Sequence, residues 1–202
     1  PVLEPNVPPL TTRLGQMKQL CDRYGSDAVN WRFDPICFFQ TSAGMTENNL
    51  HDFAYISEHA SQWGIKRCIT SFMDHYPKIK RRMSSLPEFE FVDPPLEKKL
   101  EIILNLENEL TAKHIQLSAC CEKEIIDALP PQSTVTNSSC IPNDLLLKLY
   151  GGHLSLKKDT GQRVKAGCGC KVSVDIGSYR DHPCYHNCLF CYANPASGCA
   201  RK

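Results

Sequence analysis

The sequence has no surplus of charge of either sign. Its 23 Lys and Arg residues are balanced by 22 Asp and Glu residues, so the formal net charge at pH 7 is +1. Proteins that bind nucleic acid or anionic membranes rely on a basic surface that this balance does not provide. The composition therefore argues against nucleic acid as a partner.

Two targeting features are missing as well. No apolar run is long enough to cross a bilayer, and the first residues do not form a signal-peptide pattern. We therefore expect a cytoplasmic protein with no membrane contact. The chain opens with a proline-rich stretch, residues 1–9, before any predicted strand, and we expect that N-terminal strands of the fold are missing from this sequence and lie upstream of it.

Cysteine, by contrast, is abundant, with 12 residues in a chain of 202. Three are scattered through the first third of the chain and are expected to be small core side chains: Cys21, Cys37 and Cys68. The others follow residue 119 and are not spaced like the disulfide framework of a secreted domain. Metal binding is therefore a better interpretation of this clustering than disulfide bonding.

Apolar periodicity predicts alternating helices and strands. Helices are predicted over residues 10–24, 46–63, 76–83, 94–110, 122–129 and 142–150, strands over 28–35, 66–74 and 115–120, and a linker over 84–95. Such alternation predicts a largely parallel sheet. Because three or four βα units are too few for a closed eight-stranded barrel, we predict an α/β fold with partial TIM-barrel-like βα repeats over residues 1–152. Residues 153–202 are expected to form an irregular, metal-binding cysteine-rich C-terminal tail packed on that domain.

Polar residues follow the predicted strands. Asp34 ends the first strand, Asp74 ends the second, and Glu122 follows the third. Because the carboxyl ends of parallel strands share one edge, all three are candidate catalytic residues. The alternative for each aspartate is a turn residue or helix cap. Arg32 would be costly inside a strand unless it is paired, so it is expected either to contact a carboxylate or phosphate of a cofactor or to form an ion pair with Asp34.

Three cysteines near the end of the chain, Cys184, Cys188 and Cys191, are spaced C-x3-C-x2-C, with Phe190 directly before the last. Thiolates this close in sequence can bind one metal centre. A [4Fe–4S] cluster needs four ligands, so three cysteines leave one iron with an open coordination position, where chemistry can occur.

A second group of cysteines offers a closed set of four metal ligands: Cys121 (or its neighbour Cys120), Cys140, Cys168 and Cys170. The last two lie in a tight Gly-Cys-Gly-Cys turn that can present both sulfurs to one Zn or to a second Fe–S cluster. The alternative is that these thiols are buried as small hydrophobic side chains.

The C-x3-C-x2-C spacing with Phe190 resembles the signature of the radical S-adenosylmethionine superfamily, and residues 191–195 resemble its spore photoproduct lyase-like branch. In that superfamily the motif usually lies near the start of a barrel. Its position at the end of this chain is similar to a domain-of-unknown-function family with a C-terminal cysteine cluster. The similarity covers nearly the whole chain and is carried by residues 8–36, 70–74, 121–122, 139–141, 167–170, 175–177 and Tyr179. Residues 180–183 make the loop before Cys184 slightly longer than in that family.

The resemblance implies a [4Fe–4S] cluster on the three motif cysteines, S-adenosylmethionine on the open iron, and a 5′-deoxyadenosyl radical that abstracts hydrogen from a substrate. It implies an electron donor such as a flavodoxin or ferredoxin. Arg32, Tyr192 and Asn194 are candidates for cofactor contacts. Three other functions stay open: a non-catalytic Zn or Fe–S module, an electron-transfer module, and a nucleic-acid repair enzyme like the lyase, which the missing basic surplus disfavours.

Overall fold

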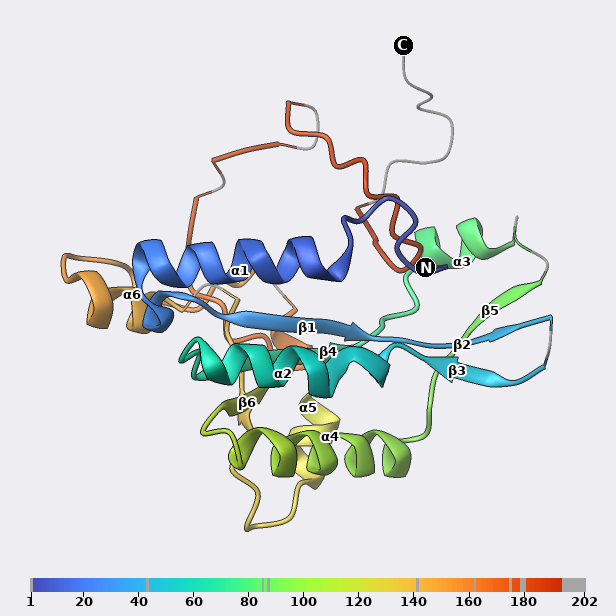
Figure 1. Ribbon diagram of the computed structural model, residues 1–202, viewed down its shortest axis with the longest axis horizontal. Helices are drawn as coiled ribbons and strands as arrows, with labels where there is room; N and C mark the ends of the chain where they lie inside the picture. Colours follow the sequence, from blue (N-terminus) through green and yellow to red (C-terminus); the bar gives the residue numbers. More distant parts are fainter. Residues whose placement is uncertain are drawn as a thin grey trace.

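A four-stranded parallel sheet lies at the centre of the molecule (Figure 1). The computed structural model describes residues 2–42, 44–84, 86, 88–140, 142–161, 163–174, 176–178 and 181–193. The strands are neighbours in the order in which they occur in the chain: β1 (Trp31–Ile36), β4 (Arg67–Phe72), β6 (Gln116–Ala119) and β7 (Thr136–Asn137). All pairs are parallel, so the four carboxyl ends share one edge.

Helices form the crossovers between these strands, as the alternating pattern predicts. α2 (Phe53–Gln62) joins β1 to β4, α4 (Leu96–Thr111) joins β4 to β6, and α5 (Lys123–Ala128) joins β6 to β7. The apolar face of α2 meets β1 through Phe53, whose ring centroid lies 5.2 Å from that of Trp31 and 5.0 Å from that of Phe33. Burial of one such side chain stabilises the fold by about 1.5–3 kcal/mol. These contacts hold the first βα unit together.

The other predicted helices are also confirmed. α1 (Leu10–Tyr24) ends at Gly25 and lies along β1 on the side away from α2 and α4 (Figure 1). α3 (Pro77–Met83) follows β4, and α6 (Asn143–Tyr150) ends at Gly151. Three short 3₁₀ helices complete the set in the described chain: η1 (Ser26–Ala28), η2 (Leu50–Asp52) and η3 (Val164–Ala166). None of the helices in these ranges combines the length and apolar character that a membrane span needs.

A second, antiparallel sheet contradicts two predictions. Its strand order is β3 (Thr46–Asn48), β2 (Phe38–Thr41), β5 (Phe89–Val92). The predicted helix 46–63 is therefore wrong over its first residues, which form β3, and α2 begins only at Phe53. The predicted linker 84–95 contains β5, which pairs with β2 and packs its aromatic rings there. The polar residues of β3 fit an exposed edge strand as well as a helix N-terminus, and the pairing with β2 decides between the two.

The end of β1 also differs from the prediction. Pro35 does not stop the strand, which continues to Ile36, because the register with β4 shifts between Phe33 and Ile36 and no ladder bond is needed at Pro35. Asn49 then fixes the chain beyond the strand. Its side chain accepts a hydrogen bond from the Cys37 backbone N–H at 2.9 Å and donates one to the Pro35 carbonyl at 3.0 Å.

A buried carboxylate on α4 fastens the segment that enters β7. Glu107 accepts hydrogen bonds from the Thr134 backbone N–H, the Thr134 hydroxyl at 2.8 Å and the Ser133 hydroxyl at 2.9 Å. Burial by itself raises the pKa of Glu107, but these hydrogen bonds outweigh it and lower the pKa below its usual value of 4.5. The ionised form is therefore favoured by folding.

Replacement of Glu107 by Gln should destabilise the protein most at neutral pH. The carboxylate's lowered pKa means that its stabilisation is complete above pH 4.5 and is lost as the pH falls through the folded-state pKa. We expect the free energy of unfolding at pH 7 to fall by about 1–3 kcal/mol, and the difference from wild type to shrink in acid. Urea unfolding at several pH values measures this.

Glu97→Gln, an exposed carboxylate in the first turn of the same helix, is the matched control and should change stability by less than about 1 kcal/mol. A Glu107→Gln effect that is the same at pH 3.5 and pH 7 would contradict the assignment of an ionised, hydrogen-bonded group.

Candidate functional site

Five cysteine thiols meet beyond the carboxyl end of β6. The Sγ atom of Cys120 lies 3.4 Å from that of Cys140 and 3.9 Å from that of Cys121. Cys121 and Cys168, Cys168 and Cys170, and Cys140 and Cys170 are also close enough to interact electrostatically. We call these five residues the thiol ring.

Two members of the thiol ring are adjacent in sequence, and in a regular strand they would point to opposite faces. Cys120 still donates its backbone N–H to the Thr70 carbonyl at 2.8 Å, continuing the ladder of β4 and β6. Cys121 then adopts φ 60°, a left-handed conformation that costs a non-glycine residue roughly 1–2 kcal/mol. This turn brings both thiols to the same side, and strain of this kind is found at functional sites.

The Gly-Cys-Gly-Cys turn is seated against the end of β7. Asn137 donates its side-chain amide to the Gly167 carbonyl at 2.5 Å. At Gly169 the approach is closer still, because a Cβ atom there would lie 2.9 Å from the Ser138 carbonyl oxygen. Only glycine fits this contact without displacement of the backbone. The turn therefore positions Cys168 and Cys170, both buried, beside the strand that leads to Cys140.

Two arginine–aspartate pairs flank the thiol ring. Arg32 pairs with Asp34 and donates from Nη1 to the Sγ atom of Cys140 at 3.0 Å, while the Ser71 hydroxyl donates to Asp34. On the other side Arg163, from the tail, pairs with Asp74. Asp74 lies just beyond the end of β4, as predicted, whereas Asp34 lies inside β1, two residues before its end. The structure uses each aspartate to hold an arginine.

The electrostatics of the ring place negative charge on Cys140. Its pKa is lowered to about 5, first by the hydrogen bond from Cys120 and then by Arg32. The pKa of Cys120 is raised in turn, by its hydrogen bond to Cys140 and by burial. The proton of this pair therefore stays on Cys120, and Cys140 is a thiolate at neutral pH.

Glu122, at the same edge, has a perturbed carboxyl group. Burial raises its pKa to about 7, against the opposing effects of a hydrogen bond from the Phe72 backbone N–H at 2.7 Å and of the Lys99 charge. A carboxyl group that titrates near neutral pH suits proton transfer. Of the three predicted catalytic candidates, Glu122 alone is outside the two arginine pairs.

The C-terminal cysteine loop, residues 184–192, lies against the first residues of the chain. The Leu189 N–H donates to the Leu3 carbonyl at 2.9 Å, and the Asn6 N–H donates to the His186 carbonyl at 3.1 Å. The Asn6 side chain adds a bond to the Tyr185 carbonyl at 2.9 Å. Leu189 is buried in a cluster with Cys37 and Met73, which directly follow β1 and β4. The loop therefore sits at the edge where the strands end.

Arg82 of α3 holds the same loop from its other side. Its guanidinium donates to the carbonyls of Leu189 at 2.5 Å, Cys191 at 3.1 Å and Cys188 at 3.5 Å. The pKa of Cys188 is raised to about 11, by burial first and then by the nearby Glu4, Cys191 and Cys184. Cys184 and Cys191 are thus both near Cys188, with Cys184 exposed and the other two half-buried.

Aromatic and charged side chains bridge the two cysteine groups. The ring of Tyr192 lies 5.5 Å from that of Tyr76, and Tyr76 in turn lies 5.8 Å beneath Arg163 and donates to Asp74 at 3.3 Å. Tyr192, a predicted cofactor contact, is therefore placed between the loop and the strand edge. The other predicted contact in this extension, Asn194, lies outside the described residues.

A cleft of about 780 Å³ runs between α1 and the first two strands. Arg32 and Asp34 line one part of it, and Phe190 of the cysteine loop lines another. Glu4, Arg13, Glu47, His51 and Asp52 add further charged or titratable groups. The cleft thus reaches Arg32, which contacts Cys140, and Phe190 of the cysteine loop, and it is large enough for a small organic ligand.

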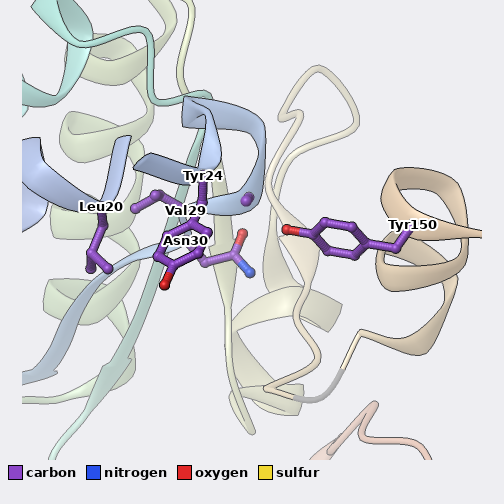
Figure 2. Close-up of a pocket in the computed structure, with 6 residues that line it drawn as sticks. Leu20, Tyr24, Val29, Asn30 and Tyr150 are labelled. Atoms are coloured by element: carbon purple, nitrogen blue, oxygen red, sulfur yellow. The ribbon is translucent and has the colours of Figure 1, made fainter. Parts of the chain in front are cut away.

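A smaller hollow of about 330 Å³ lies between the end of α1 and α6. Figure 2 shows Tyr150 pointing from α6 toward Asn30, with Tyr24 and Leu20 on the α1 side. Its lining residues include no cysteine, acid or base, and we assign it no chemistry.

Neither cysteine group is a finished coordination sphere. Over the ranges that the structure describes, no three Cys, His, Asp or Glu side chains surround a point that could hold a metal ion. In the thiol ring the sulfur of Cys120 contacts those of Cys121 and Cys140, and no point lies at bonding distance from all the sulfurs. A common centre therefore requires rotation about the Cα–Cβ bonds, which is the single torsion that places each cysteine sulfur.

Sequence reasoning missed two arginines of this region. Arg82 lies in a basic helix and acts on backbone carbonyls more than 100 residues away, so no side-chain motif reveals it. Arg163 lies in a stretch of the tail that is rich in Lys and Arg, where no single basic residue stands out. Arg163 is identified only by its ion pair with Asp74 in the folded structure.

Comparison with known proteins gives one match. The family model described as a domain of unknown function, DUF1848, matches residues 1–193. No curated protein and no solved structure matches the chain.

Replacement of Gly169 by Ala should open the thiol ring. The new methyl group would lie 2.9 Å from a backbone oxygen that cannot move cheaply, so we expect a stability loss of about 1–3 kcal/mol. We also expect faster reaction of the buried Cys168 and Cys170 thiols with a disulfide reagent in the folded protein, measured under anaerobic conditions.

Gly15→Ala is the matched control, because a Cβ atom at this exposed position of α1 meets nothing within 4 Å. It should stabilise the helix by about 0.5–1 kcal/mol and leave thiol reactivity unchanged. Equal thiol reactivity in the two variants would show that the turn does not depend on its close contact with Ser138.

Proposed function

The chain belongs to the DUF1848 family, and on that premise we propose that it is an iron–sulfur enzyme of the radical S-adenosylmethionine type, acting on a small organic substrate. The observation that carries the proposal is the position of the C-terminal cysteine loop. Leu189, between Cys188 and Cys191, is buried beside the residues that follow β1 and β4, and its neighbour Phe190 lines the large cleft. A cluster on this loop would therefore face a ligand-sized space.

The residues of the loop fit a [4Fe–4S] cluster in their donor chemistry. Cys188 and the nearby Cys184 and Cys191 supply three ligands, and the spacing leaves one iron for a cofactor. Arg82 places a positive charge beside the loop, which suits a cluster that carries negative charge with its thiolates. The half-buried Cys188 and Cys191 would cover the inner side of the cluster, and the exposed Cys184 would mark the side open to solvent.

When bound, the cluster and S-adenosylmethionine would supply a 5′-deoxyadenosyl radical. The chain's own residues would orient the reactants and close the site to solvent, which limits side reactions of such a species. Phe190 and the buried Leu189 present apolar surface there. Arg32 and Asp34 border the cleft and are candidates to bind a polar substrate or cofactor group, and Tyr192 is a candidate to stack against a cofactor ring.

Glu122 would serve as the proton-transfer group at this edge, because its raised pKa of about 7 keeps both protonation states available at neutral pH. Asp34 and Asp74 would act as positioning residues for Arg32 and Arg163. An electron donor such as a flavodoxin or ferredoxin would approach the exposed Cys184 side of the loop.

Anaerobic reconstitution of the full chain with iron and sulfide tests the proposal. We expect about four iron atoms per chain, brown visible absorption, and a reduced cluster whose electron paramagnetic resonance spectrum changes when S-adenosylmethionine is added. Reductant and S-adenosylmethionine together should yield 5′-deoxyadenosine. Single Cys→Ser substitutions at 184, 188 and 191 should each abolish the spectrum.

Cys21→Ala is the matched control, since this cysteine is buried in the main core, and it should retain the full spectrum. A cluster that S-adenosylmethionine does not perturb would favour an electron-transfer module instead. A protein that binds only zinc at the loop would refute the iron–sulfur assignment.

A further inference from the structure

We propose that the thiol ring is a second, separate metal site that binds a single zinc ion. Cys140, Cys168 and Cys170 would supply three ligands, and the Cys120–Cys121 pair would supply the fourth. In this proposal the ion joins the tail to the end of the parallel sheet and takes no part in chemistry at the C-terminal loop. It does not depend on an iron–sulfur cluster there.

The sulfur–sulfur distances favour one metal ion over a cluster. With Zn–S bonds of about 2.3 Å, tetrahedral geometry places neighbouring sulfurs about 3.8 Å apart. The sulfurs of Cys120 and Cys140, two of the proposed ligands, lie 3.4 Å apart, which is close to this value. A cubane cluster lies between its thiolates and holds them farther apart. Small rotations of the side chains would thus complete a mononuclear site, whereas a cubane would require the three segments to separate.

The tail needs such a connection because it has almost no apolar core of its own. Within the described part of residues 153–178, the buried hydrophobic residues are Cys168 and Cys170. The large apolar side chains there are exposed instead: Leu154, Leu156, Val164, Val172, Val174 and Ile176. A segment that buries so little cannot offset its conformational entropy by the hydrophobic effect. A structural metal supplies the missing free energy, as in other small metal-dependent folds.

The surroundings of the ring are those of a thiolate-bound metal. Arg32 donates an N–H to the Cys140 sulfur, and Asp34 and Ser71 hold Arg32 in turn. Hydrogen bonds of this kind orient thiolate ligands and offset the net negative charge of a four-thiolate zinc site. Arg163 lies on the Cys121 side and is held by Asp74. Both arginines are thus anchored independently of the cysteines.

Metal content of the full chain tests the site. A variant with Cys184, Cys188 and Cys191 all changed to Ser removes the C-terminal loop's ligands, so that any zinc it retains must be bound elsewhere. We expect this variant to bind one zinc ion per chain, with X-ray absorption showing four sulfur neighbours at about 2.3 Å. Cobalt should replace zinc and give the intense charge-transfer absorption of a thiolate site.

In the same background, Cys140→Ser, Cys168→Ser, Cys170→Ser and the double change Cys120→Ser/Cys121→Ser should each lower zinc retention against a chelator at least tenfold. Cys68→Ala, a buried core cysteine outside the ring, should not. Removal of zinc should make residues 153–178 sensitive to protease while the circular dichroism of the α/β domain persists, which distinguishes site loss from global unfolding.

Each of the following metal analyses would overturn the proposal: no zinc in the triple-serine variant, zinc that survives the ring substitutions, or iron and sulfide in the ring in place of zinc. A disulfide between Cys120 and Cys140 in protein purified with reductant would also exclude it. If the iron–sulfur proposal for the C-terminal loop is wrong, the cluster absorption will be missing while zinc is retained. The two proposals can therefore be refuted independently.

Discussion

The parallel pairing of β6 with β4 and with β7 is the constraint on which the thiol ring depends. It sets the ends of three strands side by side, so that residues from 70 to 140 meet within one small region. The Thr70 carbonyl accepts from Cys120 and the Ala119 carbonyl accepts from Ser138, which carries the ladder beyond the strands. Any shift of register by one residue would reverse the faces of the side chains and separate the cysteines.

Two similar arginine–aspartate ion pairs lie at the same edge of the sheet. In each, an aspartate near a strand end holds an arginine that lies next to a cysteine: Asp34 with Arg32 at Cys140, and Asp74 with Arg163 at Cys121. One arginine comes from a strand and the other from the tail. The tail is therefore bound to the sheet by charge as well as by the thiol contacts, in a region with little apolar surface to bury.

Local patterns were enough to predict the parallel βα arrangement, because each crossover helix and strand carries its own periodicity. The antiparallel sheet could not be predicted this way, since β3 is short and polar and its identity depends on β2 and β5. The predicted strand boundaries were accurate enough to single out Asp34, Asp74 and Glu122 as candidate residues near the carboxyl edge of the sheet. Cys120 could not be separated from Cys121, because their shared orientation comes from one left-handed residue that no sequence pattern requires.

The pairing of residues 3–6 with residues 185–189 joins segments about 180 positions apart along the chain. Closing so long a loop in an unfolded chain costs a few kcal/mol of entropy, whereas the folded sheet already holds both segments at one edge. The contacts between the two segments therefore depend on the sheet that lies between them in the chain. An ordered C-terminal cysteine loop therefore indicates that the chain between these two segments is folded.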